Sequence, residues 1–227
     1  MKRGGFSWTK GQFSNAFFIF LLAFLIFYIE QIPTVYLGVK DTRLVCLLVV
    51  VSLLISVGAL FLGNRLGLFE GFKALSFLKA WGKIGLTYLG IYIVTRVGTM
   101  VMMMEGVSNS TNQEAIENAH MNPFLLIMFT VIMAPIVEEL IFRGLLMGRV
   151  FNPDSIVGLI FSSLLFGLIH RPNSIGVWIV YAGMGFALGI AYRKFQKLEY
   201  CIMAHIVNNS IAVSAMLLLQ LLAPYIK

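Results

Sequence analysis

About seven long apolar stretches dominate this sequence, each close to the ~20 residues that an α-helix needs to cross a bilayer. Of the 227 residues, 59% are hydrophobic and only 12% are charged, whereas about a quarter of the residues in a soluble domain carry charge. Because a bilayer core offers the backbone no hydrogen-bond partners, runs of this length indicate helices. We therefore expect an all-α, polytopic transmembrane helical bundle of about seven spans. The stretches are approximately residues 15–38, 43–62, 83–104, 124–150, 155–170, 174–192 and 198–225.

Two less apolar segments separate some of these spans. Residues 63–82 mix cations with Phe and Trp, which is typical of an amphipathic helix at the membrane interface, although an ordinary loop is an equally good interpretation. With that helix the bundle has eight helices. Residues 105–122 are polar, hold no Lys or Arg, and are expected to form an outer loop before Pro123, which suits the first position of a helix. These features divide the chain into residues 1–122 and a late core, residues 123–227.

The distribution of Lys and Arg predicts the orientation. Eleven of them fall on the side of the N-terminus and four on the opposite side, and the richer side normally faces the cytoplasm. We therefore predict a multi-pass protein of the plasma membrane with its N-terminus in the cytoplasm. The net charge of +7 then reflects orientation and anionic lipid, so no nucleic-acid partner is expected. The first group is Lys2, Arg3, Lys10, Arg65, Lys73, Lys79, Lys83, Arg149, Arg193, Lys194 and Lys197, and the second is Lys40, Arg43, Arg171 and Lys227.

Three charges interrupt the fourth span, at Glu138, Glu139 and Arg143. An ionisable side chain at membrane depth costs roughly 2.5–3.5 kcal/mol on insertion scales, so it normally marks function. Glu139 and Arg143 are four residues apart and share one helix face, with the acid first, which favours an ion pair. Glu138 points about 100° away and lacks a local partner. A purely structural interpretation makes both acids partners of Arg143 and Arg96.

Two late spans add further polar groups. His170 closes the fifth span, and His205 shares a face of the seventh span with Asn209, four residues later. A lone histidine in such a helix is usually a hydrogen-bonding residue, but two histidines, a Glu pair and an amide on three spans favour a joint site. The two histidines differ in expected depth, because His170 falls near the outer end of its span and His205 nearer the inner end of its own.

These residue types indicate hydrolytic chemistry. Glu138 and His170 could hold and deprotonate a water, while His205 and Asn209 could donate hydrogen bonds to the oxyanion of a tetrahedral intermediate. An alternative is a zinc site with Glu138, His170 and His205 as ligands and water in the fourth position. No HExxH motif is present to decide between them. Gly185 and Gly189 of the sixth span lie at GxxxG spacing, which favours close helix packing but would also leave room for an extended peptide.

Three motifs lie in order on the late spans: Glu138-Glu139-x-x-x-Arg143, Phe166-x-x-x-His170 and His205-x-x-x-Asn209. This ordered set resembles the CPBP family (CAAX protease and bacteriocin-processing, also called Abi) over about residues 124–211. The resemblance implies an intramembrane endopeptidase with residues 123–227 as its catalytic core. It implies that Glu138 and His170 activate water, His205 and Asn209 stabilise the oxyanion, and Glu139 and Arg143 support the site. The family was named as metalloproteases, yet eukaryotic relatives are argued to be glutamate-dependent without a catalytic metal, which we slightly favour.

The resemblance also implies a biological setting. Bacterial members of this length are associated with processing or export of peptide precursors, with self-immunity to bacteriocins and with regulation of sensor kinases. We therefore expect a bacterial source, a peptide or membrane-protein substrate, and a partner membrane protein or sensor kinase, rather than a prenylated CAAX substrate. The rival classes are a non-catalytic membrane scaffold or immunity protein, and a proton-coupled transporter. The transporter is expected to show inverted-repeat symmetry, and none is visible in the sequence.

Overall fold

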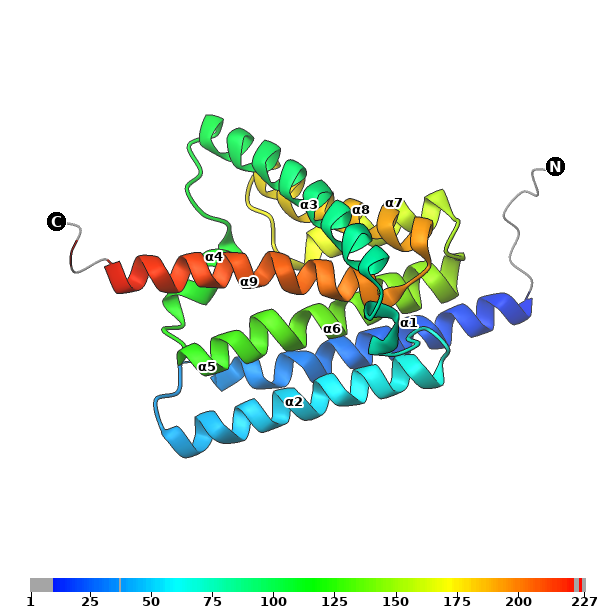
Figure 1. Cartoon of the computed structure of the whole chain (residues 1–227), viewed down its shortest axis with the longest axis horizontal. Coiled ribbons are helices and arrows are strands. Elements are labelled where there is room, and N and C mark those ends of the chain that lie inside the picture. The colour runs from blue at the N-terminus through cyan, green and yellow to red at the C-terminus, as the bar shows by residue number, and fades with distance from the viewer. Residues whose placement is uncertain (1–9, 37, 223–224, 226–227) are drawn as a thin grey trace.

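The computed structural model describes residues 10–36, 38–222 and 225, and within these residues the chain folds into helices and connecting segments without a β-strand (Figure 1). Lys2, Arg3 and Lys227, which contribute to the predicted orientation, lie outside the described residues, as does the side chain of Lys10. The elements are α1 (Lys10–Gln31), η1 (Ile32–Tyr36), α2 (Thr42–Arg65), η2 (Phe72–Leu75), α3 (Leu78–Met104), α4 (Thr111–Asn118), α5 (Pro123–Leu126), η3 (Ile127–Met133), α6 (Ala134–Glu139), η4 (Leu140–Phe151), α7 (Ile156–Ile169), α8 (Ile175–Phe195) and α9 (Leu198–Leu222).

The predicted all-α polytopic bundle is confirmed. Within the described residues, six helical segments are long and apolar enough to cross a membrane, and α7 is a shorter apolar helix of 14 residues. Large apolar side chains of α1, α2, α3 and α9 point outward, as expected where the surroundings are lipid rather than water. The protein is therefore a multi-pass membrane protein in which six segments are long enough to span and α7 falls short.

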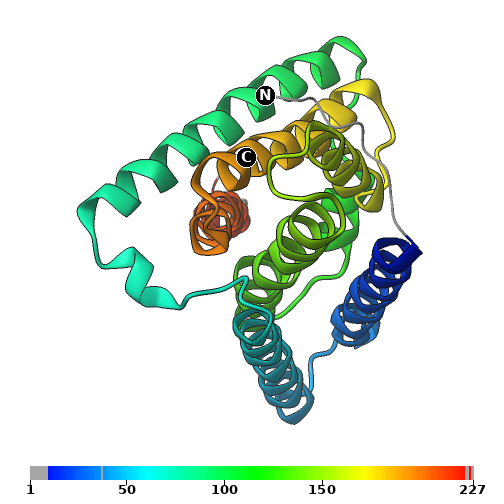
Figure 2. The same ribbon diagram turned by 90° about the vertical axis from the view of Figure 1, so that its right-hand side faces the viewer.

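The segment from Pro123 to Phe151 is the central helix of the bundle. Its most apolar window is 61% buried, compared with at most 44% for the other spans. It packs against α1, α2, α7 and α9, and Figure 2 shows it surrounded by these helices in a view close to their axes. As predicted, the helix begins at Pro123, and Asn122 accepts a hydrogen bond from the N–H of Phe124.

The central helix is not a regular α-helix. Residues 127–133 and 140–151 form wider π-helical turns on either side of α6. Pro135 has no N–H to donate, and just before it the N–H of Ala134 bonds to the carbonyl of Phe129, five residues back. Such π-helical turns are common at functional sites. Glu138 and Glu139 therefore lie on the short α-helical segment between two widened ones.

The interfacial helix suggested for residues 63–82 does not form: residues 63–65 end α2, residues 78–82 begin α3, and between them lies the single 3₁₀ turn η2. Gly67 and Gly71 both have positive φ, 66° and 96°, and end regular helix there. The predicted outer loop, residues 105–122, in contrast contains an eight-residue helix, α4. Ser110 starts this helix by accepting a hydrogen bond from the N–H of Gln113, a favourable N-cap that the polar composition concealed.

Glycines let α8 approach its neighbours closely. A Cβ on Gly185 would lie 3.1 Å from the backbone of Ser163, and one on Gly189 only 2.4 Å from Leu159, so α7 packs on these two positions. The glycine spacing thus serves helix packing. On the opposite side, Gly98 of α3 faces Val180 and Gly176 of α8.

Glu105, just after α3, stabilises the start of α8. Its carboxylate accepts hydrogen bonds from the N–H groups of Ile175 and Gly176. The bond from Gly176 is the main cause that lowers the pKa of Glu105. Because the folded pKa is the lower one, this contribution to stability is present above the pKa of the unfolded chain and is lost as pH falls through the folded value.

The α3–α8 contact predicts that Gly98→Ala destabilises the protein. The new Cβ would lie 2.6 Å from a Val180 methyl and 2.8 Å from its backbone nitrogen. Overpacking of this kind costs about 1–3 kcal/mol. Gly85→Ala on the same helix is the matched control, because nothing lies within 4 Å of its Cβ position. Thermal unfolding of the purified protein should show a lower midpoint for Gly98→Ala alone; equal midpoints would contradict this account of the contact.

Candidate active site

Glu139 is the centre of a buried polar cluster on the central helix. Its side chain and that of Arg143 are 0% exposed, and the Arg143 Nη1–H donates to Glu139 Oε1 across 2.8 Å. The predicted i,i+4 ion pair is therefore present. Arg143 Nη2–H also donates to the carbonyl of Gly185, 2.9 Å away on α8. Arg96, by contrast, lies over the ring of Tyr92 on its own helix and has no contact with either acid among the described residues.

His205 of α9 joins the cluster through the same carboxylate oxygen. Its Nδ1 lies 2.9 Å from Glu139 Oε1, and because a carboxylate oxygen only accepts, the Nδ1–H is the donor. This bond turns Nε2 toward Glu138 Oε2, at 3.8 Å. α9 lies beside α6 in Figure 1, as this contact requires. Glu139 therefore fixes both the arginine and the imidazole.

Glu138 is the more accessible acid of the pair. Its side chain is 12% exposed. Its Oε2 atom has no hydrogen-bond partner among the described residues. Glu138 thus has one buried, unpartnered carboxylate oxygen close to an imidazole, on a side chain that is partly exposed, whereas Glu139 is completely enclosed.

His170 is held at the end of α7. Its Nδ1–H donates to the carbonyl of Phe166 across 2.7 Å, which leaves Nε2 free to accept in the neutral ring. The His170 ring stacks on Tyr181, with centroids 4.2 Å apart. The Phe166 ring lies next to both histidines, 4.8 Å from the centroid of His170 and 5.9 Å from that of His205. The two histidines are therefore neighbours of one aromatic ring.

The short length of α7 explains how His170 and His205 can lie close together, although the sequence predicted different membrane depths for them. Fourteen helical residues extend about 21 Å at 1.5 Å per residue, less than the roughly 30 Å of a hydrocarbon core. The C-terminal end of α7 therefore does not have to reach the membrane surface. His170 interacts electrostatically with Glu138, His205 and Arg143, which places it in the same cluster.

Asn209 is oriented by two amide hydrogen bonds. Its Nδ2–H donates to the carbonyl of Thr130, 2.9 Å away on the central helix, and its Oδ1 accepts from Asn208 Nδ2 across 3.1 Å. No hydrogen bond joins Asn209 to Glu138 or His170 among the described residues. The structure thus brings five of the predicted residues into one cluster: Glu138, Glu139, Arg143, His170 and His205. Asn209 lies one turn after His205 on α9 and is hydrogen-bonded to the central helix.

Two residues near the cluster were not assigned a role from the sequence. Glu30, near the end of α1, is only 2% exposed, its Oε2 atom has no hydrogen-bond partner among the described residues, and its charge interacts with that of Glu138. An acid inside an apolar span is a visible signal, but the sequence does not show which helix it faces. Tyr181, which stacks on His170, gave no signal, because aromatic residues are common throughout the spans.

The geometry does not fit the zinc alternative. A zinc site requires three protein ligands around one point. Among the described residues, no three His, Cys, Asp or Glu side chains are placed to hold one metal ion. The proposed trio of Glu138, His170 and His205 is therefore not arranged as a coordination sphere.

The buried pair predicts a large loss of stability for Arg143→Met. Removing one member of a buried pair costs about 3–5 kcal/mol, because the other charge is left unpaired. The double variant Arg143→Met, Glu139→Gln should recover part of this loss. Lys197→Met is the control, since it breaks the exposed pair with Glu70, which is worth about 1 kcal/mol or less. Thermal unfolding in detergent measures all three, and similar losses for Arg143→Met and Lys197→Met would contradict the prediction.

Replacing Glu30 is predicted to raise the stability of the protein, in contrast to replacing Arg143. Glu30→Leu replaces a buried carboxyl that has an unpartnered oxygen and interacts unfavourably with the charge of Glu138, so the unfolding midpoint should rise. Glu105→Leu is the contrasting variant, because that acid accepts two hydrogen bonds at the start of α8, and its midpoint should fall. A lower midpoint for Glu30→Leu would show that this carboxyl stabilises the fold.

The comparison with protein families agrees with the three motifs. Residues 120–211 match the family model described as Type II CAAX prenyl endopeptidase Rce1-like. No curated protein and no solved structure matches the chain. The matched region runs from just before the central helix into α9 and contains every residue of the cluster, whereas Glu30 lies outside it. The resemblance predicted from the motifs is thus confirmed over residues 120–211, where the chain is similar to the CAAX-type endopeptidases of the CPBP family.

Proposed function

We propose that this protein hydrolyses a peptide bond of a membrane-associated peptide or protein precursor, using a water activated by Glu138 and His170. The observation that carries the proposal is that Glu139 binds both Arg143 and His205, which directs His205 Nε2 toward the accessible carboxylate of Glu138. Each of the two glutamates has an Oε2 atom without a hydrogen-bond partner in the described structure. Only the side chain of Glu138 is partly exposed, at 12%, whereas that of Glu139 is 0% exposed and holds Arg143 and His205.

The first step assigned to the cluster is attack by water. Glu138 takes a proton from the water, and the water oxygen forms a bond to the carbonyl carbon of the scissile peptide. His170 assists through Nε2, the ring nitrogen that Phe166 leaves free. The proton that Glu138 receives then passes to the peptide nitrogen as the C–N bond breaks. The products are a carboxylic acid and an amine, the acid gives its proton to the amine to form a carboxylate and an ammonium group, and Glu138 is again ionised.

The second role is stabilisation of the oxyanion. In its charged form His205 carries hydrogens on both nitrogens, and Glu139 holds the Nδ1–H, so the Nε2–H can donate to a developing oxyanion. Asn209 has a second amide hydrogen beyond the one given to Thr130. Arg143 and Glu139, which are fully enclosed, are assigned to positioning rather than to contact with substrate.

The substrate class follows from the site's location. The cluster lies inside a multi-pass membrane protein, so the substrate is a peptide or protein segment that reaches the bilayer. This proposal also includes the setting predicted from the sequence. The N-terminus lies in the cytoplasm, the membrane is the plasma membrane of a bacterium, and the partner is a membrane protein or sensor kinase. A prenylated peptide, named in the description of the matching family, belongs among the substrates to be tried.

The proposal predicts that Glu138→Gln, His170→Ala and His205→Gln abolish the same cleavage products. Loss of a positioned acid or base typically slows a reaction by about 10²–10⁴-fold, and loss of an oxyanion donor by about 10²–10³-fold. The measurement compares, by mass spectrometry, the peptides that cells release at matched membrane abundance of each variant.

Glu114→Gln is the control, because Glu114 is an exposed acid of α4 outside the cluster. It should release the wild-type set of peptides. If all variants release that set while a cellular phenotype is retained, the protein acts as a non-catalytic scaffold or immunity factor instead.

A further inference from the structure

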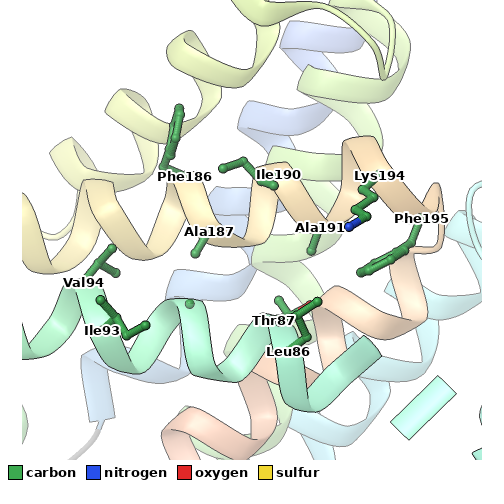
Figure 3. Close-up of a pocket in the computed structure, with 11 residues that line it drawn as sticks. Leu86, Thr87, Ile93, Val94, Phe186, Ala187, Ile190, Ala191, Lys194 and Phe195 are labelled. Carbon is green, nitrogen blue, oxygen red and sulfur yellow. The ribbon is translucent and has the colours of Figure 1, made fainter. Parts of the chain in front are cut away.

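An apolar groove follows the outer side of α3 and α8, separate from the candidate active site. Its volume is about 320 Å³. Its floor is formed by small residues, since a Cβ on Gly90 would lie only 3.6 Å from that of Ala187. Figure 3 shows Val94 and Phe186 at one end of the groove and Lys194 and Phe195 at the other. No residue of the Glu139 cluster lines it.

The lining offers an occupant no hydrogen-bond partner along its length. Apart from Lys194, the only polar side chain in the lining is that of Thr87, and its hydroxyl already donates to the carbonyl of Lys83 across 2.8 Å. A peptide in the groove would leave its N–H and C=O groups unsatisfied, which is costly in an apolar setting. A hydrocarbon chain has no such groups. The groove therefore suits an alkyl chain better than a polypeptide.

One end of the groove is strongly basic. Lys194 lies in the lining, and Lys83 and Arg193 lie at the same end of the helix pair. No carboxylate pairs with these three among the described residues, whereas nearby Lys197 pairs with Glu70. The ammonium groups of Lys83 and Lys194 instead lie 5.2 and 5.7 Å from the ring centroid of Phe195. Cations in this position attract the headgroups of anionic lipids.

We infer that this groove binds one acyl chain of an anionic phospholipid, with the phosphate of the headgroup at Lys194. Both halves of the lipid are matched: the groove walls, such as Ile93 and Ile190, contact the chain, and the unpaired cations contact the phosphate. A long basic side chain at the end of a span can extend toward the headgroups while its stem lies along the apolar wall. The inference does not depend on the proposed peptidase activity.

The test uses phosphatidylglycerol with a photoreactive group in one acyl chain, in phosphatidylcholine vesicles that contain the full-length protein. After illumination, mass spectrometry maps the labelled residues. Labelling is expected to concentrate within residues 86–94 and 186–195. Ile190→Trp fills the groove and should strongly reduce this labelling. Ile160→Trp on α7 is matched to it, because the two isoleucines are 47% and 45% exposed, and it should leave the groove labelling unchanged.

A second pair of variants tests the headgroup. Lys194→Gln should lower phosphatidylglycerol labelling about fivefold, the contribution expected of one basic residue at an anionic surface. Lys79→Gln, which removes an exposed cation of α3 outside the lining, should not. Even labelling of all lipid-facing helices would overturn the inference, as would equal labelling by a photoreactive phosphatidylcholine. Competition by a farnesylated peptide, with none by unlabelled phosphatidylglycerol, would assign the groove to a prenylated substrate and also overturn it.

Discussion

One carboxylate oxygen organises the interior of this protein. Glu139 Oε1 accepts from Arg143 on its own helix and from His205 on α9, both at less than 3 Å. In an environment without water, a charged group of this kind is tolerated only when it is paired and hydrogen-bonded. Two helices are therefore fixed relative to each other by a single acid. The accessible neighbour, Glu138, is left to face the ring that Glu139 has oriented.

The surrounding bundle is shaped so that this pairing is possible. Arg143 reaches the carbonyl of Gly185 in a helix where glycines allow α7 and α8 to pack closely. α7 is short enough to end at the cluster, which brings His170 to the depth of His205. The widened turns of the central helix on either side of α6 complete the arrangement. Packing of small residues thus has a chemical consequence, because it determines which backbone and side-chain groups can approach the acids.

Much of this arrangement could be predicted from local sequence. Span length indicates helices, and the four-residue spacing of Glu139 and Arg143 indicates their ion pair, because both depend on the geometry of one helix. The contact of His205 with Glu139, the stacking of His170 on Tyr181 and the proximity of Glu30 to Glu138 were not predictable. Each depends on how separate helices pack, which no local spacing encodes. The interfacial helix was overestimated for a related reason, since Gly67 and Gly71 end the helix despite an amphipathic pattern.

The N-terminal helices also take part in the electrostatics of the site. Glu30 lies outside the matched region of residues 120–211, yet its buried carboxyl interacts with Glu138. Counting Glu139, three acids meet one permanent cation, Arg143, in an interior where unbalanced charge is costly. The imidazole of His205, which lies between Glu139 and Glu138, and the guanidinium of Arg143 are the polar partners that the described structure offers these acids. Helix α1 therefore contributes to the electrostatic environment of the candidate active site, although it lies outside the region that carries the three motifs.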